Sequence, residues 1–502
     1  MIGESIKSVC ILGGGSAGFL SAVALRRLLP GLDVTLVHSP NVPVIGVGES
    51  TTAYLPVFLH ERLGLDVTEF YTQVVPSWKL GIRFHWGAPE DSHFNYAFEF
   101  SMNQEGPPLR KRSSYYCLED WYDAGPFSAA MDRALSPCQF DGSQFTIRPG
   151  FGYHLQNQRF IAYLHGKAEQ LGTNIISADM VDVALRDDGS VNSIRLADGR
   201  DISADLFIDA SGFRSLLLGQ RLGEPFLSYD NAIFCDSAVV GYWQRDDVVL
   251  PYTTVDTMEN GWCWRIDFLD EVSRGYVFCS QFCDPPAAMD EMKRNNPLLG
   301  DDLQLIKFRT GRYENFWSRN VVAIGNSSGF VEPLEATALH MLAAQLDMLC
   351  GSLADSNLRI SPQLVAVMNG NFREKWDDIR DCLALHYRYN RRLDTPFWRH
   401  CRQNSELGNA QPLVDFYQVA GPTIACSNFI PDSSIFGYNG YMNLLIQQRI
   451  STEYRNDFSP ADLAVWDEYR NTIRAELAHT LPARQALKML LDPNFRWPTP
   501  GV

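Results

Sequence analysis

The fold of this chain is decided by residues 8–18, which read SVCILGGGSAG. The apolar run 8–12 predicts a buried β-strand, and the helical periodicity of 19–29 predicts a helix directly after the glycines. Gly13, Gly15 and Gly18 have the Gly-x-Gly-x-x-Gly spacing, which permits a tight turn, close approach of a pyrophosphate and packing of helix on strand. With a further strand over 33–37, this is a βαβ unit. It predicts a dinucleotide site; the alternative is a tight turn without a ligand.

The start of the predicted helix supplies the phosphate-binding groups. The free N–H groups around Ser16 and Ala17, together with the positive end of the helix dipole, are expected to face the pyrophosphate. The second strand ends at His38. The carboxylate that usually binds the ribose is therefore missing, and His38 can offer one hydrogen bond in its place.

The predicted domains are assembled from separate parts of the chain. The nucleotide-binding core combines 1–50, 150–215 and 315–350; aromatic-rich insertions of mixed strand and loop occupy 51–149 and 216–314; and 351–502 reads as mostly helical. Pro333 is expected in the first turn of a long apolar helix that runs to about Cys350. Ser459 and Pro460 have the residue types of an N-cap and a first helical position, so a helix should begin there.

Composition excludes several classes of function. The chain has 502 residues and a formal net charge of −16, which disfavours binding to nucleic acid or to an anionic membrane surface. Its 11 cysteines are scattered, without a Cys-x-x-Cys pair or a common metal-ligand spacing, which indicates reduced thiols in a cytoplasmic protein and no metal. We find no membrane-spanning run and no signal peptide. Aromatic residues make up 12% of the chain, which indicates either a large aromatic core or a pocket for a flat ring.

Two further stretches distinguish FAD from NAD. Residues 205–212, DLFIDASG, resemble the second motif of FAD-dependent aromatic hydroxylases, and 321–326, VVAIGN, resemble the third, with Asn326 where Asp is usual. The three motifs occur in the expected order and favour FAD. The predicted fold is therefore α/β, with an FAD-binding Rossmann-like core of the aromatic-hydroxylase type.

The resemblance extends to flavin-dependent halogenases of the tryptophan-halogenase type. It is carried by the glycine loop, 46–51 (GVGEST), 77–81 (SWKLG), 261–266 (GWCWRI) and 325–337 (GNSSGFVEPLEAT). This resemblance implies a two-component system, in which a separate flavin reductase supplies reduced FAD. Reduced FAD, oxygen and halide then give hypohalous acid, which travels through a tunnel to an aromatic substrate held away from the flavin.

The same resemblance assigns two catalytic residues. Lys79 would direct the hypohalous acid onto the ring, either as a charged hydrogen-bond donor or as a neutral amine that is itself halogenated; the sequence leaves both open, and a surface lysine is the alternative. Glu335, expected just inside the helix start, would stabilise the cationic ring and take its proton. Glu332 competes for this role. Either carboxylate could instead complement the helix dipole.

Other positions follow from the matched stretches. Gly48, Glu49, Ser50, Asn326 and Leu339 are expected to bind the cofactor. The backbone N–H groups of Thr337 and Ala338 would bind the halide. Because the family usually has Gly at the position of Ala338, we expect an altered halide preference, in favour of bromide. Trp262 and Trp264 alternate along a strand, so both should face one side, beside the flavin or within the core.

The substrate site is less well defined. His93, Phe94, Tyr96, Phe98 and Phe100 form an aromatic stripe that would either hold an indole or form one face of a buried strand. The late segment 436–441 has aromatic residues but lacks the Glu that holds the amino-acid group of free tryptophan in the family. We therefore expect an indole-type substrate without a strict need for the tryptophan backbone.

Two other functions remain compatible with the sequence. One is a single-component FAD-dependent monooxygenase that hydroxylates an aromatic ring and is itself reduced by NAD(P)H. The other is a catalytically silent flavin-binding protein. The presence of both Lys79 and Glu335 argues against the second.

Overall fold

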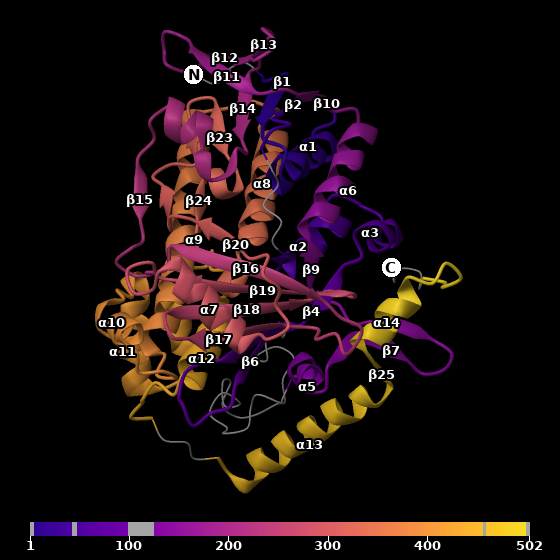
Figure 1. Cartoon of the computed structure of the whole chain (residues 1–502), viewed down its shortest axis with the longest axis vertical. Coiled ribbons are helices and arrows are strands. Elements are labelled where there is room, and N and C mark those ends of the chain that lie inside the picture. The colour runs from indigo at the N-terminus through magenta and orange to yellow at the C-terminus, as the bar shows by residue number, and fades with distance from the viewer. Residues whose placement is uncertain (1–4, 43–47, 99–124, 455–457, 498–502) are drawn as a thin grey trace.

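The computed structural model describes residues 5–42, 48–98, 125–454 and 458–497. The upper part of the molecule is built on a six-stranded sheet with the strand order β10-β2-β1-β14-β23-β22 (Figure 1). Its strands are β1 (Ser8–Leu12), β2 (Asp33–His38), β10 (Asn174–Ser177), β14 (Leu206–Asp209), β22 (Trp317–Ser318) and β23 (Val321–Ala323). All neighbours pair in parallel except β22 and β23. This is the predicted Rossmann-like α/β sheet.

Both faces of this sheet are covered. Val9 and Ile11 of β1 belong to one apolar cluster, whereas Cys10 and Leu12 belong to another, as the alternation of side chains along a strand requires. Helix α1 (Ser16–Leu28) connects β1 to β2 and packs against α6 (Asn157–Gln170). The predicted strand–helix–strand opening is therefore confirmed.

A second sheet of seven strands lies below the first in Figure 1. Its order is β20-β16-β19-β18-β17-β5-β6, with β5 (Gly81–His85), β6 (Phe94–Ala97), β16 (Ser237–Gln244), β17 (Thr253–Met258), β18 (Gly261–Asp267), β19 (Glu271–Phe278) and β20 (Gln304–Lys307). Only β5 and β17 pair in parallel. Strands from two distant parts of the chain thus share one sheet.

A small sheet joins the two larger parts. Its central strand β9 (Gly152–Gln156) pairs on one side with β3 (Gly48–Ser50) and on the other with β4 (Ser77–Lys79). The shorter elements are α2 (Tyr54–Pro56), α3 (Val67–Val74), α5 (Pro126–Asp132), α7 (Pro285–Asn295), β7 (Leu135–Phe140), β8 (Phe145–Ile147), β11 (Met180–Leu185), β12 (Val191–Leu196), β13 (Asp201–Ser203), β15 (Phe226–Ser228), β21 (Gly311–Tyr313), β24 (Gly329–Phe330) and β25 (Thr480–Pro482).

The helix predicted from Pro333 to about Cys350 is interrupted, so this prediction was wrong at its start. Pro333–Glu335 is a 3₁₀-helix, Ala336 has a left-handed backbone with φ of 56°, and helix α8 runs from Ala338 to Asp355. A left-handed residue cannot continue a right-handed helix, because it breaks the regular hydrogen-bond ladder. Glu335 therefore lies in a separate turn that precedes α8.

The C-terminal part is helical. It contains α9 (Pro362–Tyr389), α10 (Pro396–Asn404), α11 (Gln411–Ala420), α12 (Gly437–Gln447), α13 (Pro460–Glu476) and α14 (Ala483–Leu490). Ser459 caps α13 in a capping box with Asp462, and Pro460 is the first helical residue, as predicted. Helices α10 to α12 lie beside the seven-stranded sheet, α13 runs along the lower edge, and α14 returns to the small strands β4 and β7 (Figure 1).

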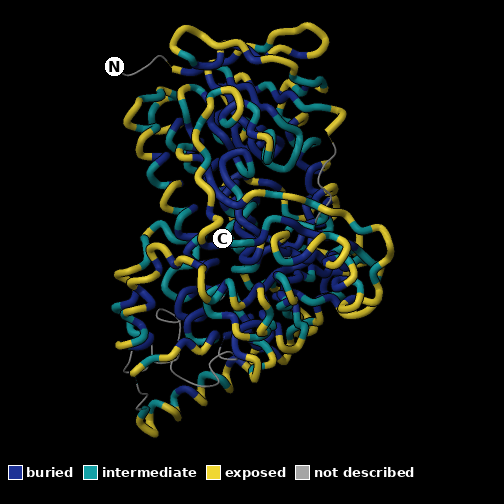
Figure 2. The backbone as a smooth tube through the Cα atoms, turned by 60° about the vertical axis from the view of Figure 1, so that its left-hand side comes forward, coloured by how far each residue is buried: buried dark blue, intermediate teal, exposed yellow. Residues whose placement is uncertain are grey.

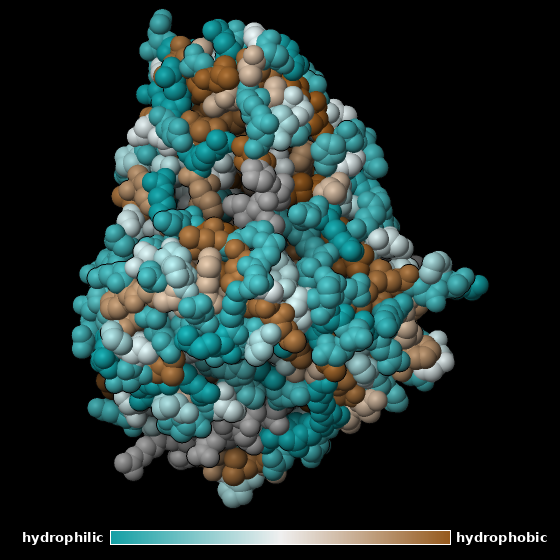
Figure 3. Space-filling model, in the orientation of Figure 1, coloured by the Kyte–Doolittle hydropathy of each residue, from teal (hydrophilic) through white to brown (hydrophobic). Residues whose placement is uncertain are grey.

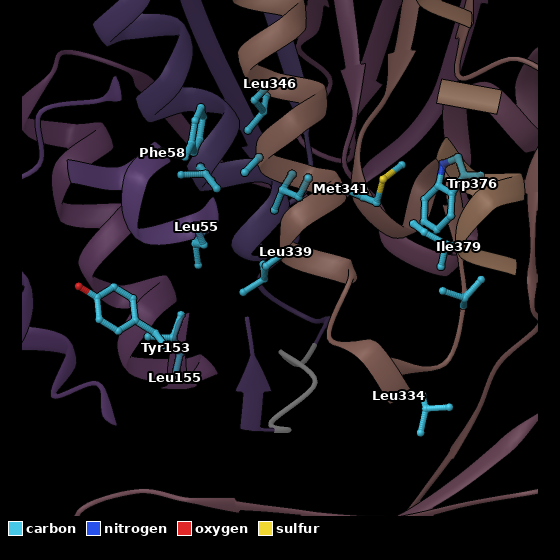
Figure 4. Close-up of a cluster of buried hydrophobic side chains, with 14 of the residues drawn as sticks. Leu55, Phe58, Tyr153, Leu155, Leu334, Leu339, Met341, Leu346, Trp376 and Ile379 are labelled. Carbon is cyan, nitrogen blue, oxygen red and sulfur yellow. The ribbon is translucent and has the colours of Figure 1, made fainter. Parts of the chain in front are cut away.

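The largest apolar cluster surrounds the first turns of α8. Leu339, Met341 and Leu346 of α8 pack between Phe58 and Leu155 on one side and Trp376 and Ile379 on the other (Figure 4). Buried residues gather along the centre of the molecule, and exposed residues lie mostly at its periphery (Figure 2). On the face seen in Figure 3, hydrophobic residues form scattered patches within a mainly hydrophilic surface. None of the helices in the described ranges has the length and apolar character to cross a membrane.

Candidate active site

A cavity of about 1340 Å³ lies where α1 begins and the strands of the six-stranded sheet end. Its volume exceeds the range of roughly 300–1,000 Å³ typical of small-molecule pockets and suits a dinucleotide. The predicted cofactor residues that line it are Gly13, Gly15, Ser16, Ala17, His38, Gly48, Glu49, Ser50, Asn326 and Leu339. Residues that were predicted from separate motifs are therefore brought together around one space.

The three motif glycines have different roles. A Cβ on Gly13, whose φ is +138°, would lie 2.1 Å from the carbonyl oxygen of Ala210, and one on Gly18 would lie 1.9 Å from that of Gly13. Both positions therefore require glycine for the turn and for helix–strand packing. A Cβ on Gly15 would meet nothing within 4 Å, since this residue faces the cavity. Gly18 itself packs behind the loop and is not part of the wall.

The start of α1 suits an anion. Gly15 is the N-cap of α1, and no side chain caps this helix end. Its first turn holds no acidic residue. Because Gly15, Ser16 and Ala17 line the cavity, the free N–H groups of the first turn are available to a bound anion. His38 stands at the end of β2 on the same wall, and burial lowers the pKa of its imidazole, which favours the neutral form. The size of the cavity, this helix end and the glycine loop fit FAD.

The strand β3 forms another part of the wall. Removal from water raises the pKa of the Glu49 carboxyl to about 7. The Ser50 hydroxyl lies 3.0 Å from the Thr253 hydroxyl, and both residues line the cavity. The preceding residues Gly46 and Val47 of the same motif lie outside the described residues.

The two tryptophans of β18 face the same side, as predicted, but only one of them reaches the cavity. Trp264 lines the cavity. The ring of Trp262 lies behind that of Trp264, with a centroid distance of 6.1 Å. Trp262 is completely buried and donates its Nε1–H to Glu332 Oε1 at 2.9 Å. Trp264 thus occupies the place beside the cavity that was expected for both tryptophans, whereas Trp262 fits the core position that the sequence left open as the alternative.

Glu332, the competing carboxylate, has structural partners. Its Oε1 accepts hydrogen bonds from Trp262 and from the Tyr387 hydroxyl, and the residue is completely buried. Desolvation raises the pKa of Glu332 to about 7, although these hydrogen bonds act in the opposite direction. This carboxyl therefore joins β18 to α9 inside the core.

The segment 333–338 separates the cavity from the buried side chains of Glu335 and Thr337. Pro333, Ala336 and Ala338 line the cavity, whereas Glu335 and Thr337 are buried away from it. Thr337 is the N-cap of α8 but makes no side-chain capping bond, and Ala338 is the first helical residue. The backbone N–H groups at this helix start suit a halide beside the cavity, where the sequence predicts one.

Lys79 lies at the end of β4 and is completely buried, so the alternative of a surface lysine is wrong. Its Nζ has no hydrogen-bond partner among the described residues and lies 5.2 Å from the centre of the Phe98 ring. Desolvation lowers the pKa of Lys79 to about 7, and the nearby charge of Glu335 acts in the opposite direction. A substantial share of neutral amine is therefore present at neutral pH.

Lys79 and the strand that lines the cavity lie at opposite edges of the small sheet. Ser50 on the cavity wall pairs with His154 of β9, and Lys79 pairs with Gly152 of the same strand. Two strand spacings place the outer strands β3 and β4 roughly 10 Å apart. Of the described residues that line the cavity, none is Lys79 or Glu335. Lys79 and Glu335 are therefore separated from the cavity by other residues of the protein.

Glu335 has a partner that the sequence did not indicate. Its Oε1 lies 2.7 Å from Nε2 of His386, which belongs to α9. Both side chains are almost completely buried. No local motif connects a histidine in the middle of a helical region to a glutamate so far away in the chain, so sequence reasoning missed His386.

Part of the predicted aromatic stripe lies on this side. Phe94 stacks on Phe84 with a centroid distance of 5.1 Å, and Phe84 lies 4.9 Å from the His386 ring. Phe98 lies beside Lys79. His93 instead faces Asp132, at 3.9 Å. Phe100 lies outside the described residues.

The tyrosines of the late segment are used within the protein. Tyr441 of α12 donates its hydroxyl to the buried Asp378 at 2.7 Å, and Tyr438 donates to the carbonyl oxygen of Pro422 at 3.2 Å. Across the described residues, no group of three or more His, Cys, Asp or Glu side chains could hold a metal ion. The ten described cysteines are buried and unpaired by disulfides.

Comparison with known proteins is consistent with this geometry. A sequence model of the tryptophan halogenase family matches residues 8–461. The chain is 34% identical over 451 residues to the tryptophan 7-halogenase RebH of Lentzea aerocolonigenes, with 82% of each chain covered. Among solved structures it is similar to MibH, a lanthipeptide tryptophan 5-halogenase, with 34% identity, a TM-score of 0.89, and 97% of this chain and 94% of that chain covered. It is also similar to BrvH, a flavin-dependent halogenase from a Brevundimonas species, with 27% identity, a TM-score of 0.85, and 97% and 99% covered.

Proposed function

Because this chain belongs to the tryptophan halogenase family, we propose that it is a two-component FAD-dependent halogenase of indole-type rings in which Lys79 and Glu335 carry the chemistry. A separate flavin reductase supplies the reduced FAD. When bound, reduced FAD activates oxygen, which with halide yields hypohalous acid. The observation that carries the proposal is a completely buried lysine, with a pKa of about 7, beside a buried glutamate behind the wall of the cofactor cavity.

The neutral amine of Lys79 is the group that captures the halogen. Its nitrogen attacks the halogen of hypohalous acid, the halogen–oxygen bond breaks, and water leaves with the proton that the amine loses. The nitrogen–halogen bond then breaks as the carbon–halogen bond forms on the ring. The low pKa of Lys79 supports this route, because the charged ammonium has no lone pair for the attack.

Glu335 completes the substitution. Its carboxylate stabilises the cationic ring and accepts the proton from the substituted carbon, so that the electron pair of that C–H bond returns to the ring. The proton then restores the N–H of Lys79. Glu332 is not assigned this role, because the carboxylate whose charge acts on Lys79 is Glu335, whereas Glu332 bonds to Trp262 and Tyr387 within the core.

The backbone N–H groups of Thr337 and Ala338 hold the halide at the start of α8. The wall between them and Lys79 keeps the substrate away from the flavin, which supports halogenation over direct oxygen transfer to the ring. Ala338 adds a methyl group beside this site, and we expect bromide to be preferred over chloride.

The substrate is an indole that need not carry a free amino-acid group. Two observations support this: the late segment contains no Glu, and both Tyr438 and Tyr441 are bound inside the protein. RebH is named for tryptophan and MibH for a tryptophan of a lanthipeptide. Comparable turnover of indole and tryptophan is expected, and activity on tryptophan alone would contradict the substrate assignment.

The experiment that tests the function combines the protein with FAD, a flavin reductase with NADH, oxygen, and chloride or bromide. Mass spectrometry of indole, tryptophan and phenol substrates is expected to detect halogenated indoles. The hydroxylase alternative predicts rapid flavin reduction by NAD(P)H without the reductase and a product heavier by one oxygen. The silent-protein alternative predicts FAD binding without any product.

A further inference from the structure

The partner of Glu335 is fixed in place by its surroundings. The His386 ring lies 4.9 Å from the Phe84 ring, at an interplanar angle of 34°, and 6.0 Å from the Trp86 ring, at 88°. Trp86 also donates its Nε1–H to the backbone carbonyl of His386 at 2.9 Å. Phe84 in β5 and Trp86 just after it therefore contact both the imidazole and the backbone of α9. These contacts leave the ring little freedom to rotate away from Glu335.

The hydrogen bonds determine the tautomer of His386. Its Nδ1 is buried and has no partner in the described part of the chain, whereas Nε2 lies 2.7 Å from Glu335 Oε1. An imidazole with its proton on Nε2 satisfies this contact and leaves only a lone pair without a partner at Nδ1. An imidazolium would bury an unbound Nδ1–H as well, which costs more. With this tautomer the ring donates its Nε2–H to Glu335 Oε1.

This contact has a consequence for proton removal. A carboxylate can rotate about its side-chain bonds, and a base works only when one oxygen lies within hydrogen-bond reach of the proton. The bond from His386 engages Oε1 and restricts the rotation of the carboxylate. The charge of Glu335 acts on Lys79, so the carboxylate is close to the group that delivers the halogen.

We propose that His386 is the positioning residue of the halogenation: it holds Glu335 Oε1 so that Oε2 faces the substituted ring carbon and accepts its proton. This rests on the proposed function. The step breaks the ring C–H bond, returns its electron pair to the ring and transfers the proton to Oε2; His386 remains neutral and touches neither substrate nor halogen. Without it, loss of the proton becomes the slow step.

Three variants test this. His386→Phe keeps a ring against Phe84 but removes the donor, and His386→Gln places an amide N–H near the position of Nε2. We expect H386F to slow halogenation at least tenfold, because positioned bases contribute about 10²-fold or more, and H386Q to recover most of the loss. In the Glu335→Gln background, H386F is expected to add no further loss, since the two residues act as one unit.

The decisive readout is the isotope effect on indole that is deuterated at every ring carbon. The wild type is expected to show a ratio of rates near unity, and H386F a clear primary effect, because C–H cleavage has become rate-limiting. A slow H386F without an isotope effect, or a variant as fast as the wild type, would overturn the proposal. Should H386F not fold, His386→Asn takes its place, since its shorter amide reaches only the position of Nδ1.

Two controls separate this inference from the proposed function. Oxygen consumption with the reductase and FAD reports on the flavin half of the reaction and is expected to be unchanged in H386F. If the wild type yields no halogenated product, the proposed function fails. If the wild type is active and H386F lacks the isotope effect, only the role of His386 fails.

Discussion

The indole ring of Trp264 lies directly over Gly275 on the neighbouring strand. The two residues are paired between β18 and β19, and a Cβ on Gly275 would lie 1.9 Å from the ring. Gly275 therefore makes the space that lets Trp264 form part of the cofactor cavity wall. The indole ring of Trp264 is therefore held between the backbone of Gly275 and the cavity.

The substitution Gly275→Ala is expected to displace Trp264 into the cavity. We expect a loss of about 1–3 kcal/mol of stability from overpacking, together with weaker FAD binding. Denaturant unfolding and titration of FAD fluorescence measure the two effects. Gly300→Ala is the matched control, because a Cβ there meets nothing within 4 Å. Equal behaviour of the two variants would show that Trp264 is not held in this way.

Lys79 predicts a pH dependence of halogenation. Because the pKa of Lys79 is lowered to about 7, the share of neutral amine increases as the pH rises from 6 to 8. The halogenation rate is therefore expected to rise between pH 6 and pH 8 and to be lower still below pH 6. Lys79→Arg, which stays charged, is expected to lose at least 10²-fold in product formation while FAD binding is retained. A rate that falls with rising pH, or an active K79R, would favour the charged hydrogen-bond donor instead.

Glu332 predicts a pH dependence of stability. Its pKa is raised from 4.5 to about 7 in the folded protein. Below about pH 4.5 the Glu332 carboxyl is protonated in both the folded and the unfolded protein. Between about pH 4.5 and pH 7 it ionises only in the unfolded protein, so the free energy of unfolding falls as the pH rises. Above pH 7 this loss reaches on the order of 3 kcal/mol. Glu332→Gln cannot ionise and can still accept the bonds from Trp262 and Tyr387.

The measurement is the difference in unfolding free energy between wild type and E332Q at pH 5 and at pH 8. We expect E332Q to become more stable relative to the wild type as the pH rises from 5 to 8. An equal difference at both values would mean that Glu332 is ionised in the fold at both pH values.

Ala338 predicts a halide preference. In a single assay with equal chloride and bromide, we expect brominated product to dominate, and Ala338→Gly to shift the ratio toward chloride by removing the methyl group. The helix should tolerate this change, since glycine at a helix end costs about 1 kcal/mol or less. A clear chloride preference of the wild type would refute the assignment.

Local patterns predict the parts of this fold that depend on neighbouring residues. The run 8–12 is strand β1 in full, and the roles of Gly13 and Gly18 follow from spacing alone, because the turn and the helix it starts are continuous in sequence. The common facing of Trp262 and Trp264 follows from the period of a strand. In each case the deciding contacts are local.

Features that depend on distant residues could not be predicted. The residues around Ala336 are good helix formers and give no sign of the left-handed backbone that ends the 3₁₀-helix there. The parallel pairing of Ile82 with Thr253 joins two segments whose order along the chain does not indicate contact. The bond between Glu335 and His386 arises only when α9 packs against the turn before α8.

In the proposed reaction, a buried lysine behind the cofactor cavity transfers halogen to an indole ring. This transfer is tested most directly by mass spectrometry of indole incubated with FAD, reductase, NADH, oxygen and bromide, with wild type and Lys79→Ala in parallel. We expect bromoindole from the wild type and none from K79A, with equal FAD binding by both proteins. Bromoindole from K79A at the wild-type rate, or an oxygenated product from the wild type, would contradict it.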